Sequence, residues 1–120
     1  LQELLSGLLP GRDYHFLALA PELFEKVDFV DRSFCFVVSQ LKVSHLSRAA
    51  IEGQYGGLHG HFLLLNNRLK ARHELAGQRI GTGFISSKNC LFRELNGGIE
   101  WIFSNDAVRI KKIRDHYLQN

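Results

Sequence analysis

The chain has 120 residues, of which 45% are hydrophobic and 22% are charged, and its formal net charge is +3. These values are typical of a globular protein with one hydrophobic core, so we expect a single domain over residues 1–120. No apolar run approaches the roughly 20 residues that a membrane-spanning helix needs, which excludes a helical membrane protein.

The first half of the chain contains several short predicted elements. Apolar residues at helical spacing predict a helix over residues 1–9. Residues 14–19 indicate a short strand, and residues 21–26 indicate a helical turn with proline at its first position. Residues 33–45 are rich in β-forming side chains and predict a long strand, whereas residues 47–55 favour neither helix nor strand.

The second half mixes expected strands and helices. We expect strands over residues 58–65 and 99–103, a strand or helical turn over 68–75, and helices over 84–95 and 107–118. Asn66-Asn67 is typical of a turn between the first two of these elements. Gly97 and Gly98 suit the end of one helix, and Asn105-Asp106 suits the start of the other.

The charges are unevenly distributed along the chain. Residues 1–65 carry a net charge of −2, and residues 66–120 carry +5. An anionic ligand would therefore be attracted to the second half. The chain contains no methionine, which favours a trimmed or processed start and a fragment of a longer protein.

The two cysteines, Cys35 and Cys90, lie far apart and each stands among apolar neighbours. This environment favours buried free thiols over a disulfide bond. Free thiols are typical of a reducing, cytoplasmic setting.

The stretch Gln78-Arg79-Ile80-Gly81-Thr82-Gly83 is the motif most closely tied to a chemistry. Two glycines one residue apart allow backbone N–H groups to approach a ligand, since no Cβ stands in the way. The helix expected directly behind the motif has a positive N-terminus that favours a negative charge. We therefore interpret the motif as a loop that holds a phosphate or pyrophosphate.

This spacing resembles the coenzyme A-binding loop of the GNAT superfamily of N-acetyltransferases. The order of expected elements over residues 56–120 is also similar to that family, although Lys112 stands where the family often has a tyrosine. The resemblance implies an α+β fold with a central, mostly antiparallel sheet flanked by helices. It implies an acyl-CoA-dependent N-acyltransferase, or a degenerate domain of that fold that still binds coenzyme A.

The resemblance also implies roles for individual residues. Acetyl-CoA or another acyl-CoA would serve as co-substrate, and the acceptor would be the amine of a small molecule or peptide. Glu74, or His73 beside it, would act as the base, and Tyr117 as the acid. The residues that would hold the coenzyme are Gln78, Arg79, Ile80, Gly81, Thr82, Gly83 and Asn105.

Two other functions remain open from the sequence. Arg109, Lys112 and His116 form a basic stripe on the last expected helix, as in a non-enzymatic module that binds nucleic acid. His59 and His61 lie on one face of an expected strand, which could be half of a haem or metal site. The nearest third ligands, His45 and His73, lie on elements whose position is uncertain, and no acidic ligand stands at a useful spacing. We therefore assign no metal site. A homodimer is a further option for the chain.

Overall fold

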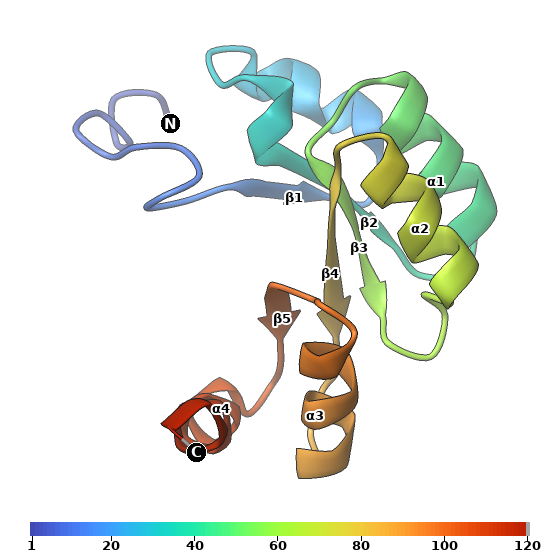
Figure 1. Cartoon of the computed structure of the whole chain (residues 1–120). Coiled ribbons are helices and arrows are strands. Elements are labelled where there is room, and N and C mark those ends of the chain that lie inside the picture. Colours follow the sequence, from blue (N-terminus) through green and yellow to red (C-terminus); the bar gives the residue numbers. More distant parts are fainter. Residues whose placement is uncertain (120) are drawn as a thin grey trace.

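In the computed structural model, which describes residues 1–119, the chain forms a five-stranded sheet. The strands are β1 (Phe16–Ala18), β2 (Cys35–Ser39), β3 (Gly57–His61), β4 (Arg79–Gly83) and β5 (Trp101–Phe103). They lie in chain order, and each strand is parallel to the next. The sheet curves into a half-barrel (Figure 1).

Helices connect the strands. The α-helices are α1 (Val43–Glu52), α2 (Asn67–Leu75), α3 (Lys88–Asn96) and α4 (Ala107–Gln119), and two 3₁₀ segments, η1 (Pro21–Val27) and η2 (Arg32–Phe34), lie between β1 and β2. Figure 1 shows α1 and α2 together on one side of the sheet, with α3 and α4 near the end toward which β3 and β4 point.

The expected mostly antiparallel sheet of an α+β, GNAT-like protein is wrong. Every described strand pair is parallel, because a helix crosses back over the sheet between β2 and β3, β3 and β4, and β4 and β5. This order is the one of a β/α barrel. The acyltransferase assignment is wrong as well, because the parallel sheet contradicts the antiparallel fold that the resemblance implied.

Helix α1 was not predicted from the sequence, and its omission led to the wrong fold class. The long strand expected over residues 33–45 is instead the short strand β2 followed by the start of α1. Val43, Leu46, Ser47 and Ala50 follow helical spacing, and this stripe is the side of α1 that is turned inward. The β-forming residues before it concealed the change of period from two to 3.6.

The ends of two helices follow local capping chemistry. The side chain of Asn66 accepts a hydrogen bond from the Leu69 amide at 2.9 Å, so residues 68–75 form a helix rather than a strand. The helix expected over 84–95 begins only at Lys88, because Ser87 is its N-cap and accepts from the Cys90 amide at 3.2 Å. Gly97 caps its C-terminal end, as expected.

Residues 1–9 form turns rather than the expected helix. The short strand near residue 16 and the helical turn after Pro21 are confirmed, with narrower or slightly longer bounds. No helix within residues 1–119 is long and apolar enough to cross a membrane. Cys35 and Cys90 are both free thiols, and Cys35 is buried.

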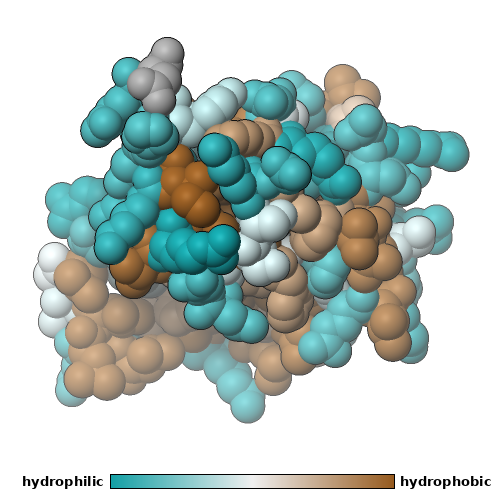
Figure 2. All heavy atoms as spheres, turned by 90° about the horizontal axis from the view of Figure 1, so that it is seen from below, coloured by the Kyte–Doolittle hydropathy of each residue, from teal (hydrophilic) through white to brown (hydrophobic). Residues whose placement is uncertain are grey.

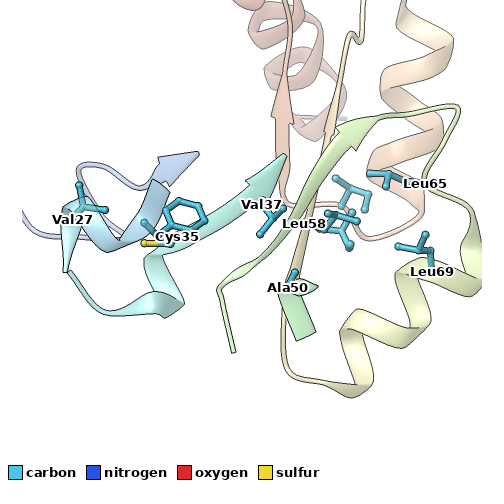
Figure 3. Close-up of a cluster of buried hydrophobic side chains, with 10 residues drawn as sticks. Val27, Cys35, Val37, Ala50, Leu58, Leu65 and Leu69 are labelled. Carbon is cyan, nitrogen blue, oxygen red and sulfur yellow. The ribbon is translucent and has the colours of Figure 1, made fainter. Parts of the chain in front are cut away.

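The main core lies between the sheet and helices α1 and α2. Val37, Leu58 and Ile80 are register partners on one face of the sheet and pack with Ala50 and Leu69 (Figure 3). A second cluster, formed by Ile85, Leu91 and Ile110, joins α3 to α4. Because side chains alternate along a strand, the residues between these core positions face the concave side of the half-barrel. We call this concave side the inner face.

Candidate functional site

All five strands end at the same edge of the sheet, because they are parallel. In β/α barrels this carboxyl-terminal edge carries the functional side chains, on the loops that follow the strands. We call it the mouth of the half-barrel. Figure 2 views the molecule from this end and shows hydrophobic residues gathered between hydrophilic ones.

His61, the last residue of β3, is the titratable side chain at the centre of the mouth. Its imidazole is nearly parallel to the rings of Phe62 and Phe84, with centroid distances of 4.7 Å and 5.2 Å. The Leu63 amide donates a hydrogen bond to His61 Nδ1 at 3.1 Å. An accepting Nδ1 carries no proton, so the proton of the neutral ring lies on Nε2. Within residues 1–119, this Nε2–H group has no hydrogen-bond partner.

The backbone at Phe84 holds this arrangement in place. Phe84 has φ = +64°, in the left-handed region that residues other than glycine rarely adopt. Such a conformation costs on the order of 1 kcal/mol or more and is found preferentially at functional sites. It turns the chain out of β4 and leaves the ring 54% exposed beside His61.

Two arginines connect the loops around His61. Arg93 on α3 donates to the carbonyl of Phe62 at 3.2 Å, and its guanidinium lies 5.4 Å from the centroid of the Phe62 ring. Arg109 on α4 donates to the carbonyl of Ser86 at 3.0 Å and pairs with Asp106 at 3.4 Å. Both side chains are more than half exposed, so each still presents N–H donors to solvent.

The glycines of the Gln78–Gly83 motif lie in strand β4 and not in a loop. A Cβ on Gly81 would stand 2.6 Å from the His59 ring, and one on Gly83 would stand 2.0 Å from the Phe103 ring. Both glycines therefore make room for rings on the inner face. Their absence of a side chain serves packing, and the predicted anion-binding loop before a helix at Phe84 is wrong.

His59 lies in the middle of these inner-face rings. It is 2% exposed and has Phe36, Trp101 and Phe103 around it, with Phe103 stacked at 5.7 Å. Burial lowers its pKa to about 4, with a smaller contribution from His15 nearby. Neither ring nitrogen has a hydrogen-bond partner within the described part of the chain. The neutral imidazole is thus a buried donor and acceptor, both unsatisfied.

Gln78 and His73 form a buried network of their own. Gln78 Nε2 donates to the carbonyls of Ala50 and Tyr55, which fixes its Oε1 as the acceptor of the His73 Nδ1 proton at 2.8 Å. His73 Nε2 then accepts from the Ser47 hydroxyl at 2.7 Å. Burial is the main cause that lowers the pKa of His73. This order resembles a nucleophile and its base, but Ser47 and His73 are fully buried, so no substrate can reach them.

Of the residues expected at an acyltransferase site, Glu74, Gln78, Arg79 and Ile80 line one cleft, whereas Asn105 and Tyr117 are not part of it. Glu74 and Arg79 are exposed, and the cleft lies near the amino-terminal ends of β4 and β5. Asn105 follows β5 and lies at the opposite end of the sheet. Tyr117 packs on Phe92, where its hydroxyl donates to Asn96 Oδ1 at 2.8 Å. Ile80 and Thr82 are buried in β4.

Part of the observed site was predictable from the sequence. His59 and His61 do share the inner face of β3, as alternation along a strand predicted. Phe84 and Ser86 were expected within a helix, and their place at the mouth depends on the positive φ of Phe84. Within residues 1–119, no three His, Cys, Asp or Glu side chains are grouped so as to hold a metal ion.

Comparison with known proteins adds one similarity of fold. No family model and no curated protein matches the chain. A solved structure described as a glycerophosphoryl diester phosphodiesterase from Agrobacterium tumefaciens is similar over 98% of this chain, with a TM-score of 0.75 and 12% identity. The match covers 51% of that protein, so this chain spans about half its length. The similarity supports the barrel-like parallel fold and gives no support to an acyltransferase or a nucleic-acid-binding module.

Proposed function

We propose that this chain recognises the phosphate group of a phosphodiester at the mouth of its half-barrel. The observation that carries the proposal is His61. Its imidazole is held between two phenylalanine rings at the end of β3, with Nδ1 occupied and an unpaired N–H on Nε2. A fixed N–H donor of this kind suits a phosphate oxygen.

The charges around the mouth favour an anion. Arg93 and Arg109 lie at the border of the mouth, and helices α3 and α4 begin at the loops after β4 and β5. The positive N-terminal ends of helices stabilise negative charge nearby. Asp106 pairs with Arg109 at 3.4 Å and Glu94 with Arg93 at 3.2 Å, so the groups left to attract an anion are the remaining N–H donors of the two exposed guanidinium groups and the two helix N-termini.

The aromatic rings suit the rest of such a ligand. A phosphodiester carries a single negative charge between two organic groups, so its site needs both a donor and apolar walls. Phe62 and Phe84 flank His61 and provide these walls. The description of the structural neighbour as a phosphodiesterase agrees with this ligand class, and half of that protein has the fold seen here.

Titration with glycerophosphocholine, followed by ¹⁵N NMR of the histidine side chains, tests the proposal. We expect the His61 Nε2 resonance to shift with a saturable, millimolar dependence on ligand concentration. His61→Ala should weaken binding by about tenfold, which corresponds to about 1.4 kcal/mol for one hydrogen bond to a charged group. Arg109→Ala should weaken it by a smaller factor.

Two controls separate the mouth from unspecific binding. Arg72 is exposed near the end of α2, from which the chain enters the amino-terminal end of β4, away from the mouth, so Arg72→Ala should bind like the parent. Choline and glycerol, which lack the phosphate, should leave His61 unshifted. Equal binding by His61→Ala and the parent, or no shift of His61 at saturating ligand, would contradict the proposal.

A further inference from the structure

The inner face differs from the other side of the sheet in having no covering helix layer. Parallel sheets normally have both faces covered, because their strands present apolar side chains on each side. Helices α1 and α2 cover the outer face (Figure 1). On the inner face, Leu17 is 49% exposed beside its register partner Phe36.

The two edges of the sheet are also open. β1 and β5 are three-residue strands, and each pairs on one side only within the described chain. Open edges present unpaired backbone groups, and closing the sheet into a barrel removes them. Barrels of this class have eight strands, so this curved sheet of five lacks about three.

His59 supplies an independent observation from the centre of the inner face. A buried polar group without a partner costs roughly 1–3 kcal/mol, and such groups are rare in complete structures. Both nitrogens of His59 are unsatisfied although the side chain is 2% exposed. Gly81 leaves the space in which this ring lies, so its position is set by the shape of the neighbouring strand.

We propose that the inner face and the edges β1 and β5 form the interface for a complementary segment of about three parallel β/α units, which closes the barrel. The structural neighbour is consistent with such an occupant, because 49% of its chain remains outside the region that matches this one. The interface does not depend on the phosphate proposal, since it involves the inner face and the edges.

A second copy of this chain fits this interface poorly. Two copies would give a sheet of about ten strands, more than the eight of this barrel class. They would also place His59, Phe36 and Trp101 of one copy against the same rings of the other. The interior of an eight-stranded barrel is only wide enough for one set of packed side chains.

Trp101 provides a spectroscopic probe, because it is the only tryptophan and lies in edge strand β5, 5.4 Å from Phe36 on the inner face. The chain would carry 5-fluorotryptophan and be joined by sortase ligation to the unmatched half of the Agrobacterium protein, in each order in turn. The linker keeps the local concentration of the added half high. In one of the two orders, we expect the ¹⁹F resonance to shift and its solvent isotope effect to fall.

Two exposed leucines form a matched pair of variants. Leu17→Glu places a charge on the proposed interface and should abolish the shift, while the variant chain remains folded alone because this side chain is half exposed. Leu75→Glu, at a 90% exposed position at the end of α2, should leave the shift intact. An unchanged resonance in both orders would overturn the proposal. So would a shift of the free chain that follows its own concentration, since that would identify a second copy as the occupant.

Discussion

At the scale of single residues, buried His59 differs most from an exposed side chain, because burial lowers its pKa to about 4. Alternation along β3 was sufficient to predict that His59 and His61 share a face. Alternation did not predict which of the two side chains is buried, because burial depends on the neighbouring strands β4 and β5. His59 is buried among rings, whereas His61 lies at the mouth with one nitrogen unpaired.

The low pKa of His59 should make the fold sensitive to mild acid. The pKa is about 4 in the folded chain and about 6.5 in the unfolded chain, so the unfolded state binds more protons between these values. The stability from this group is complete above pH 6.5 and is lost as the pH falls toward 4. Between pH 7.5 and 4.5, urea denaturation should report a loss of about 2–3 kcal/mol from this group.

A substitution isolates this contribution. His59→Phe keeps an aromatic ring on the inner face and should reduce the pH dependence by about 2 kcal/mol. Part of the dependence should remain, since burial also lowers the pKa of His15 and His73. His45→Phe, at an exposed position, should retain the full dependence. If His59→Phe lost as much stability in acid as the parent, His59 would not be the responsible group.

At the scale of elements, capping residues located helix ends in the second half of the chain, whereas α1 and β4 were not predicted. Asn105-Asp106 and Gly97-Gly98 marked helix ends near those observed. Asn66 was interpreted as a turn, although its side chain caps α2. The same residue types suit turns and N-caps, and only the chain that follows distinguishes the two.

The contact between α2 and α3 depends on a buried ion pair. Glu94 is fully buried and accepts from Lys70 Nζ at 3.0 Å and from Arg93 at 3.2 Å. Lys70→Met should leave the carboxylate with one half-exposed partner and lower the free energy of unfolding by about 2 kcal/mol in urea denaturation. The double variant Lys70→Met/Glu94→Gln should recover part of this loss, since no buried charge remains.

An exposed pair gives the matched control. Arg114 and Asp115 are adjacent on α4 and about half exposed. Arg114→Met should therefore change the stability by less than about 0.5 kcal/mol. If Lys70→Met cost no more than Arg114→Met, burial of Glu94 would not depend on Lys70.

At the scale of the whole molecule, one missed helix reversed the predicted sheet. A strand-helix-strand order requires parallel neighbours, because the helix returns the chain to the starting end of the sheet. Because α1 was divided between a predicted strand over 33–45 and residues 47–55 that favoured neither helix nor strand, residues 33–75 resembled a run of neighbouring strands. The correct order of β2, α1, β3, α2 and β4 gives the half-barrel directly.

The half-barrel should exchange its amide protons in a pattern set by strand position. β3 and β4 have neighbours on both sides, whereas β1 and β5 have one open edge each. Hydrogen exchange measured by NMR should therefore be at least about tenfold slower at Leu58 and Ile80 than at Leu17 and Ile102. Equal protection across all five strands in the chain alone would contradict the open half-barrel.

The sequence alone was sufficient to predict strands near β1, β2, β3 and β5, the end of α3 at Gly97, the free cysteines and the shared face of His59 and His61, but it did not reveal β4 or α1. These features depend on contacts within a few residues, so periodicity and capping chemistry reveal them. Only the tertiary structure decided the direction of the strands and the role of Gly81 and Gly83. A glycine that admits a backbone to a phosphate and one that admits a neighbouring ring look alike in sequence, because the group that fills the space comes from another strand.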